Sequence, residues 1–352
     1  MIELIKYDNP EKWNNIVNSY INKDVYYLCE YSISLMESEG GTPYLINYKG
    51  EDCSLCYPII EKDIADFEKF KGILKKNTYF DWSTPYGYGG PLSNKLFTLS
   101  QQRAFKKELF YLAKSRNVVS QFIRFHPLLK NHLICNNVIE NTYVKDTIFI
   151  NMDTKDNLFI QMDSKNRNMI RKAIKNNVII KHDKGKYIND FINIYNETMK
   201  RDNASPFYYF PKAYYQYIKN SMSNEVEYFY AFKNNVMIAA SIFFYSDKFM
   251  HYHLSANLLE YRKYAPTNLL IYTAANWGRE KGLKQLHLGG GLNLDDSLFH
   301  FKKQFNKEGK INFYIGGNIF DIDIYEKLLK LRYKYDNNFN VNNNNYIKYR
   351  KI

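Results

Sequence analysis

The stretch from residue 261 to residue 305 constrains the fold of this chain more than any other stretch. Its first part, YRKYAPTNLLIYTAANWGREKG, predicts a loop that enters a helix, with Pro266 in the first turn and Gly282 at the C-terminal end. The next part, KQLHLGGG, predicts a short strand that runs into three glycines. A helix that leads straight into a strand is typical of α/β and α+β folds.

Strands and helices alternate in the rest of the chain too. Helical spacing of apolar residues predicts helices after Pro10, over residues 99–116 and over residues 188–199. The chain of 352 residues is long enough for two domains, and we place the boundary near residue 155. The Asn-rich end, KYDNNFNVNNNNYIKYRKI, is expected to be a frayed tail. Apolar runs predict strands at TPYLINYK, CSLCYPII, VVSQFIRFH, TYVKDTIFINM, VIIKHD, EVEYFYAF, VMIAASIFFY and KFMHYHLSA.

The charge of the chain bears on its partners. The formal net charge is +13, which favours a partner of negative charge, namely a nucleic acid, a nucleotide-linked substrate or an anionic membrane face. A lysine-rich proteome would give the same charge, so that interpretation stays open. The N-terminus MIELIKYDNPEKW lacks the apolar core of a signal peptide, and no apolar run is long enough to span a membrane. We therefore expect a cytoplasmic protein that contacts an anionic membrane at most peripherally.

No pattern of metal ligands stands out in the sequence. Cys53 and Cys56 form a CxxC pair, but no second pair completes a zinc site, so a structural role is expected. His251 and His253 lie two apart on a predicted strand and point the same way, without a third ligand at a recognisable spacing. We predict no metal and no resident cofactor, and we interpret His287 as a strand residue that lines a substrate cleft.

The segment LHLGGGLNLDDSLFHFKKQF is the first candidate for a site. Gly289 and Gly290 let the backbone approach a ligand closely. Asp295 and Asp296 suit the N-terminus of a helix, where a carboxylate caps free amides. Lys302, near the start of that helix, could hold a phosphate or stabilise a developing oxyanion. A capped helix with a solvated lysine would explain the same residues.

The loop DWSTPYGYGGPL, residues 81–92, is the second candidate. Its proline and glycines predict irregular structure. It offers an acid, hydroxyls and phenols that can bind a carbohydrate or a peptide, and the candidate substrate-binding residues are Asp81, Thr84, Tyr86 and Tyr88. A tight connection between two strands is the alternative interpretation.

The basic helix DSKNRNMIRKAIKNN is the third candidate. Arg167, Arg171 and Lys175 lie at i, i+4 and i+8 and form one cationic ridge, while Ile170, Ala173 and Ile174 face the other way. With Lys165, the ridge could follow the phosphates of a tRNA. An ordinary solvated helix face has the same pattern.

These motifs together resemble the FemABX family. The run LGGG…DDSLFHFKKQF is similar to the family signature of a glycine pair after a strand, a polar spacer and a Phe-Lys couple. SKNRNMIRKAIKNNVII resembles the basic helix of the family, YNETMKRDNA its Thr-x-x-Arg helix end, and EYRKYAPTNLLIYTAANW its Tyr-Ala-Pro loop. The resemblance covers roughly residues 160–310.

The resemblance implies two tandem GNAT-like domains with mixed sheets flanked by helices. They would span residues 1–155 and 156–322, and a helix within residues 323–352 would return to the first domain. No coiled-coil arm is expected. Aminoacyl-tRNA would be the donor and an amine of a peptidoglycan precursor the acceptor. By position, Phe301 and Lys302 match the catalytic couple, and Arg201 and Tyr264 lie in stretches that would bind substrate.

The sequence departs from the family at the positions that hold the phosphates of a UDP-linked precursor. YLCEYSISLMES and ASPFYYFPKAYY contain no clear equivalents, and Lys212 is the nearest cation in the second stretch. A lipid-linked acceptor or a sugar amine therefore stays open.

Two other functions stay open as well. The first is acyl-CoA-dependent N-acylation of an amino sugar or amino acid, although YRKYAPTN has no glycine and Pro266 removes an amide that a CoA pyrophosphate would need. The second is non-catalytic binding of a nucleic acid or a glycan. No oligomeric state follows from the sequence.

Overall fold

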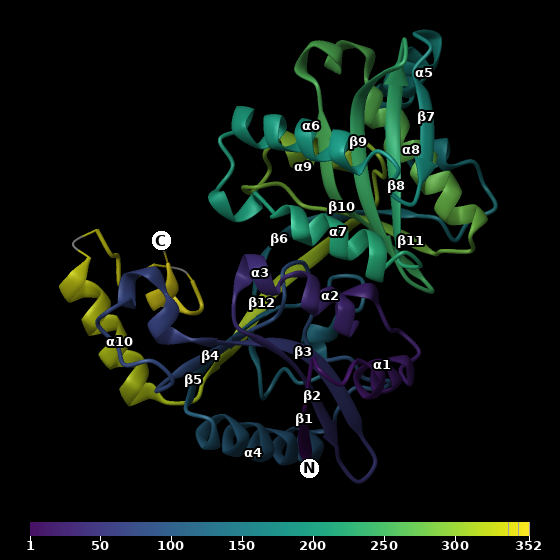
Figure 1. Ribbon diagram of the computed structural model, residues 1–352. Helices are drawn as coiled ribbons and strands as arrows, with labels where there is room; N and C mark the ends of the chain where they lie inside the picture. The colour runs from purple at the N-terminus through teal and green to yellow at the C-terminus, as the bar shows by residue number, and fades with distance from the viewer. Residues whose placement is uncertain (337, 344, 352) are drawn as a thin grey trace. The chain divides into compact units, whose positions relative to one another are not determined.

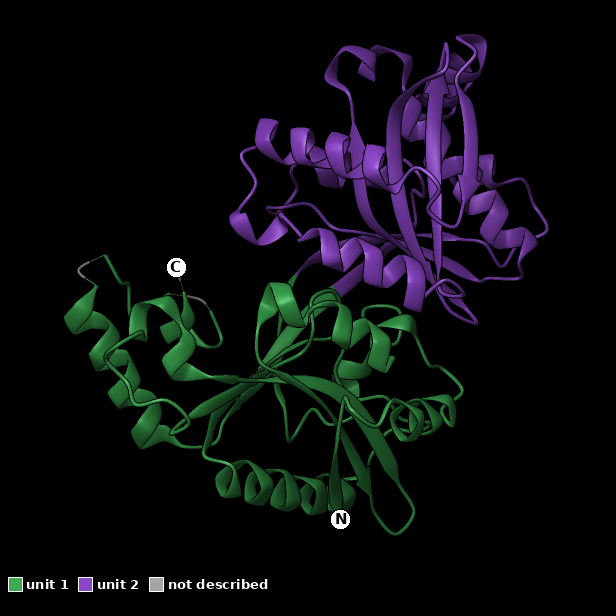
Figure 2. Ribbon diagram, viewed as in Figure 1, with its two compact units in different colours: residues 1–144, 313–352 green, residues 145–312 purple. Residues whose placement is uncertain are grey.

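The computed structural model describes residues 1–336, 338–343 and 345–351. The chain divides into two compact units, shown in different colours in Figure 2. Unit 1 contains residues 1–144 and 313–352, and unit 2 contains residues 145–312. The chain leaves unit 1 within strand β6 and re-enters it within strand β12, whereas the sequence analysis drew its boundaries at residues 155 and 322.

Unit 1 is built on a mixed sheet. All neighbouring strands run antiparallel except β4 and β5, which run parallel. Because a parallel pair needs a crossover connection, helix α4 (Leu99–Ser115) joins β4 to β5. The strand order is β1 (Ile2–Lys6), β2 (Thr42–Lys49), β3 (Ser54–Asp63), β4 (Phe80–Ser83), β5 (Val118–Arg124) and β12 (Lys310–Ile319).

The helices of unit 1 come from both ends of the chain (Figure 1). The C-terminal helix α10 packs against β5, and Tyr325 and Leu328 join Val119 in one apolar cluster. Ile347 and Tyr349 belong to the same cluster and are buried, so the expectation of a frayed tail was wrong for residues 345–351. The main helices are α1 (Pro10–Asn18), α2 (Cys29–Ser34), α3 (Met36–Glu39), α4 and α10 (Ile322–Tyr335).

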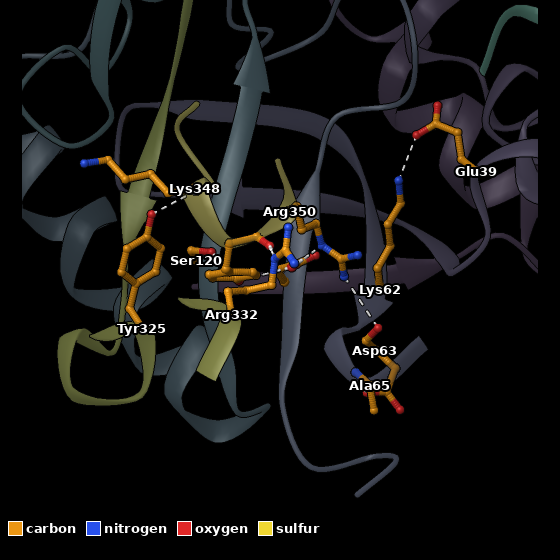
Figure 3. A network of polar contacts seen from close by, with 11 residues as sticks. Glu39, Lys62, Asp63, Ala65, Ser120, Tyr325, Arg332, Lys348 and Arg350 are labelled. Atoms are coloured by element: carbon orange, nitrogen blue, oxygen red, sulfur yellow. Dashed lines mark hydrogen bonds and ion pairs between the residues drawn. The ribbon is translucent and has the colours of Figure 1, made fainter. Parts of the chain in front are cut away.

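A buried polar network fastens this C-terminal segment to the sheet of unit 1 (Figure 3). The guanidinium of Arg350 pairs with the carboxylate of Asp81 at 2.5 Å, and Asp81 is 1% exposed. The hydroxyl of Tyr349 contacts Ser120 at 2.9 Å and donates to Asp81 at 3.1 Å. Asp81 itself lies in β4, so residues 81–83 form a strand where the sequence analysis predicted irregular structure.

Unit 2 repeats the strand arrangement of unit 1 in strands of its own. Its neighbouring strands run antiparallel except β10 and β11, which run parallel and are joined by α8 (Pro266–Glu280). The strand order is β6 (Glu140–Asn151), β11 (Gln285–Gly289), β10 (Phe249–Asn257), β9 (Val236–Tyr245), β8 (Val226–Lys233) and β7 (Ile179–Asp183). The remaining helices are α5 (Ser164–Lys175), α6 (Ile188–Arg201), α7 (Lys212–Ser221) and α9 (Ser297–Lys303).

Helices cover both faces of the sheet in unit 2. Phe229 and Ala231 of β8 join the apolar cluster that α5 and α8 complete. Tyr230, which points to the opposite face, contacts Tyr187 at the start of α6. The predicted inner face of α5 was wrong in one residue, because Ile174 is 55% exposed. Asn166 occupies the inner face in its place and accepts a hydrogen bond from the side chain of Asn268 at 2.8 Å.

The predicted fold class, an α/β fold of mixed sheets flanked by helices, is confirmed. The longest helix that the structure describes in unit 2 is α8, with 15 residues, which fits the expectation of no coiled-coil arm. Within the described residues, none of the helices combines the length and the apolar character that crossing a membrane requires.

Candidate active site in the second unit

The turn between β11 and α9 is shaped by glycines. Gly289 adopts a φ of +73°, and the pairing of β11 with β6 shifts register beside it. A Cβ on Gly290 would lie 2.9 Å from the carbonyl oxygen of Asp146 on β6. A Cβ on Gly291 would lie 2.0 Å from a carboxylate oxygen of Asp296. The turn therefore brings its backbone closer to β6 and to Asp296 than any residue with a side chain allows.

Asp296 closes this turn as the N-cap of α9. Its carboxylate accepts hydrogen bonds from the backbone N–H groups of Leu292 at 2.6 Å, Asn293 at 2.9 Å and Phe299 at 2.8 Å. Burial would raise the pKa of Asp296, but these three backbone donors outweigh burial and hold its pKa below the usual value. The carboxylate is thus ionised and organises the turn from inside, as the sequence predicted for a capping residue.

Lys302 lies on α9 with its ammonium group beneath the turn. The residue is 8% exposed, and its Nζ donates a hydrogen bond to the carbonyl oxygen of Gly290 at 2.7 Å. Burial lowers the pKa of Lys302 to about 7, the charge of Lys145 lowers it as well, and Asp296 opposes both effects. A lysine of this kind changes its charge easily when an anion arrives, because an opposite charge nearby favours the protonated form.

Lys145, on β6, is the residue of this site that the sequence analysis missed. Its Nζ donates to the carbonyl oxygens of Gly291 at 2.5 Å and Leu292 at 3.2 Å. Burial lowers the pKa of Lys145, and the charge of Asp296 opposes that effect. Lys145 and Gly291 are 146 positions apart, and no spacing in the sequence connects them.

His287 lies on β11 next to this turn. Its Nε2 contacts the hydroxyl of Thr147 at 2.9 Å, and that hydroxyl donates its hydrogen to the carbonyl of Ile311 at 3.1 Å. The imidazole therefore donates from Nε2. The ring of His251 on β10 meets that of His287 edge to face, with centroids 5.8 Å apart. Both histidines are buried, as a strand position predicts.

The two ammonium groups make the turn a cationic site. In the part of the chain that the structure describes, neither Lys302 nor Lys145 pairs with a carboxylate within ion-pair distance. An ammonium group has three N–H donors, and Lys302 uses one of them in the hydrogen bond to the Gly290 carbonyl. Such a group can donate to an anionic oxygen of a ligand.

Phe301, the neighbour of Lys302, is partly buried and packs edge to face on Phe305, with ring centroids 5.4 Å apart.

The predicted loop of unit 1 is held by its own neighbours. The hydroxyl of Thr84 accepts from the backbone N–H of Arg124 at 3.1 Å. The backbone N–H of Tyr86 donates to Glu39 at 2.7 Å, and Figure 3 shows Lys62 pointing at the same carboxylate, 2.9 Å away. Burial raises the pKa of the Tyr88 phenol. The role of this loop in substrate binding stays a prediction.

Arg201 connects α6 to β10. Its guanidinium donates to the carbonyl of Asn257 at 2.9 Å, and the hydroxyl of Thr198 contacts the same carbonyl at 3.2 Å. Both residues of the Thr-x-x-Arg pattern thus attach the end of α6 to β10. Tyr264 ends the short helix η7 (Leu259–Tyr264) before α8, and the ammonium of Lys233 lies 4.6 Å from its ring centre. Substrate binding by Arg201 and Tyr264 remains a prediction.

The cationic residues of α5 differ in what they contact. Arg167 is occupied, because its guanidinium donates to the carbonyls of Met162 at 2.7 Å and Phe159 at 3.3 Å. Arg171 is exposed and lies over the ring of Phe159, 5.7 Å from its centre. Lys165 and Lys175 are exposed as well. Only the exposed members of the predicted ridge are placed to meet an external phosphate.

A family profile matches part of the chain. The sequence profile of the FemAB family matches residues 215–334, a segment that contains the glycine turn and Lys302. The resemblance to the FemABX family drawn from the sequence is thus confirmed over this segment. Among curated proteins, no sequence matches the chain significantly.

Solved structures share the fold of this chain. The crystal structure of FemX superposes with a TM-score of 0.67 at 14% identity, covering 93% of this chain and 99% of FemX. L-PGS from Bacillus licheniformis gives a TM-score of 0.56 at 12% identity, covering 92% and 96%. The C-terminal domain assigned to a lysylphosphatidylglycerol synthetase from Agrobacterium fabrum gives 0.53 at 10% identity, covering 88% and 91%. At these identities the likeness concerns the fold.

Proposed function

We propose that this chain is a FemAB-type enzyme, which transfers an aminoacyl group from aminoacyl-tRNA to an amine of a peptidoglycan precursor. The observation that carries the proposal is the buried ammonium of Lys302, which touches the Gly290 carbonyl and has no carboxylate partner among the described residues. The family match supports the type of reaction, because the matched residues include this site.

The chemistry is an attack of an amine on an ester. The amine nitrogen of the acceptor adds to the ester carbonyl of the donor, and the carbonyl oxygen becomes an oxyanion. The intermediate collapses when the bond to the ribose oxygen breaks, so that an amide C–N bond replaces the ester C–O bond. The proton lost by the amine ends on the released ribose hydroxyl. A preorganised cation at the oxyanion stabilises the transition state more than the ground state.

Lys302 is the group proposed to supply this positive charge. Its buried position strengthens the interaction with an oxyanion, because few waters screen the charge. Because its pKa is about 7, Lys302 is only partly protonated at neutral pH in the free protein. An anionic substrate would favour the protonated form. Phe301 is proposed to keep α9 in place through Phe305.

The exposed cations of α5 are proposed to bind the tRNA backbone. Arg171 and Lys175 lie four residues apart on one face of the helix and are exposed, as a phosphate-binding surface requires. The acceptor could equally carry its amine on a sugar or be linked to a lipid. A cytoplasmic location is part of the same proposal.

A donor competition assay tests the proposal. The purified chain is offered charged tRNA and acetyl-CoA with a panel of amine acceptors, and the labelled acyl group is followed. We expect transfer from charged tRNA, loss of at least about a hundredfold in kcat for Lys302→Met, and wild-type turnover for the control Lys284→Met. Lys284 is a suitable control because it precedes β11 and pairs with Asp153 at 2.9 Å.

Other outcomes would contradict the proposal. Transfer from acetyl-CoA alone would favour the N-acyltransferase alternative. Salt-sensitive binding of tRNA or glycan without any turnover would favour a non-catalytic binding protein. A fully active Lys302→Met variant would remove this residue from the mechanism.

A further inference from the structure

We propose that Lys145 is a positioning residue of the catalytic turn. It binds the carbonyls of Gly291 and Leu292, the two residues that follow Gly290, and the carbonyl of Gly290 binds the ammonium group of Lys302. This inference rests on the proposed function, since it assigns a role in the same site. Lys145 itself is not placed against the reacting atoms, and it acts through the turn.

The first support is the sequence of carbonyl contacts along the turn. Gly290, Gly291 and Leu292 are consecutive, and the carbonyl of each accepts a hydrogen bond from a lysine ammonium group. Lys302, which lies on α9, binds the first of these carbonyls. Lys145, which lies on β6, binds the other two. A displacement of this three-residue segment would therefore disturb contacts with both lysines.

The second support is the rigidity of the strand that carries Lys145. β6 pairs with β11, so its backbone is fixed to the strand that leads into the turn. Asp146, the next residue, has its carbonyl so close to Gly290 that no side chain fits between them. Lys145 is half-buried, and its ammonium group binds two backbone carbonyls. An ordinary surface lysine keeps its ammonium group in water instead.

The third support is the charge around Lys302. Lys145 is the like charge that acts on it from β6, and Asp296 is the opposite charge that acts from the start of α9. Asp146, which follows Lys145 on β6, pairs with Lys310 at 2.6 Å. Asp295 lies within 3.5 Å of His300 on the exposed side of the turn. Removal of the charge on Lys145 would therefore leave Asp296 as the main influence and raise the pKa of Lys302.

A purely structural role for Lys145 makes a different prediction. A lysine that only stabilised the turn would change the melting temperature and leave kcat where it was. A positioning lysine changes three properties together: the titration midpoint of Lys302, kcat and the pH profile. KM should change little, because the substrate-binding surfaces are untouched.

The experiment combines NMR with kinetics on the full chain. Lysine labelled with ¹³C at Cε is incorporated, the Lys302 signal is assigned with Lys302→Met, and its titration is followed in wild type, Lys145→Met, Lys145→Arg and the control Lys284→Met. We expect Lys145→Met to move the Lys302 midpoint to higher pH, to lower kcat about tenfold to a hundredfold and to change KM less than about threefold. Lys145→Arg, which keeps the charge and donors, should restore most of kcat.

Several results would overturn the inference. They are an unchanged midpoint in Lys145→Met, an equal loss of kcat in Lys284→Met, and a failure of Lys145→Arg to improve on Lys145→Met. If Lys145→Met does not fold, Lys145→Gln supplies the same comparison, because its amide keeps two N–H donors without the charge. The titration needs no substrate, so a wild-type chain without transferase activity would refute the proposed function and leave the electrostatic test intact.

Discussion

The ammonium group of Lys302 donates to the backbone carbonyl of Gly290 at 2.7 Å and lies under a turn that a second lysine holds from the other side. A backbone carbonyl orients an ammonium group without neutralising it. The charge of Lys302 therefore remains available to a substrate, and burial makes it sensitive to whatever anion enters.

The pH profile of turnover should fall as pH rises through about 7. Lys302 has a pKa of about 7 in the free protein, and the proposed role needs its protonated form. We expect kcat/KM to be flat at lower pH and to decrease above this value, while kcat decreases at higher pH because a bound anion raises the pKa. Lys302→Arg should lose this alkaline decrease, since arginine stays protonated. An increase of kcat/KM through pH 7 would instead assign the neutral amine as a general base.

Lys302→Met should be more stable than the wild-type chain near pH 7. The pKa of Lys302 falls from 10.5 to about 7 on folding, so the folded state binds fewer protons than the unfolded state between these values. Wild-type stability therefore rises with pH in this window, and the advantage of Lys302→Met, on the order of 1–3 kcal/mol at pH 7, should disappear near pH 10.5. Urea denaturation at several pH values measures the difference. A variant less stable than wild type at pH 7 would contradict it.

Gly291→Ala should damage the site more than the fold. The new Cβ would lie 2.0 Å from a carboxylate oxygen of Asp296, so Asp296 must leave the three backbone donors that it binds. We expect kcat to fall at least about tenfold with a stability loss of about 1–3 kcal/mol. Gly282→Ala is the matched control, because Gly282 has a φ of +82° with open space around it and should cost about 1 kcal/mol without loss of kcat. Equal kcat values in both variants would refute the role of the turn.

Arg350→Met should destabilise unit 1 strongly. Asp81 is 1% exposed, and the variant would leave its carboxylate buried without its cationic partner. Loss of one partner of a buried pair costs about 3–5 kcal/mol, and the double variant with Asp81→Asn should recover part of that loss. Urea denaturation measures these losses. The KM of Asp81→Asn, measured alongside its stability, tests the substrate-binding prediction for Asp81. A rise of KM in Asp81→Asn with unchanged stability would favour that prediction over the structural role.

Charge reversal on α5 should weaken tRNA binding and its salt dependence. Arg171→Glu with Lys175→Glu removes two exposed cations, and each lost phosphate contact lowers the slope of log K against log salt by about 0.7–0.9. Lys172→Glu is the matched control, since Lys172 is exposed on the same helix about 100° away from Arg171. Binding measured by filter retention at three salt concentrations gives the slopes. Identical slopes for the control and the double variant would place the tRNA elsewhere.

The local parts of the site could be predicted because they lie close together in the sequence. Gly289, Asp296 and Lys302 belong to one short stretch, where a strand end, a cap and a helix start have recognisable patterns. Lys145 could not be found this way, because a contact across 146 positions leaves no periodic signal. The pairing of Asp81 with Arg350, 269 positions apart, was hidden for the same reason.

Two errors have a physical cause in packing. Ile174 lies four residues after the buried Ile170, so helical spacing predicted burial, yet α5 turns Asn166 toward α8 and leaves Ile174 exposed. A hydrogen bond between two side-chain amides makes a polar residue acceptable there. The asparagines of the C-terminal segment led to the prediction of a frayed tail. Its position is decided instead by the apolar residues Ile347 and Tyr349, which join the core of unit 1.

The discontinuity of unit 1 sets an order of events during synthesis. Unit 2 is one continuous stretch, so all of it has left the ribosome before β12 can pair with β5 and before Arg350 can reach Asp81. The nascent N-terminal segment must wait with an unpaired strand edge, which is a surface that other chains can join. Unit 2 should therefore fold before unit 1, and chaperones should be needed most until β12 has been added.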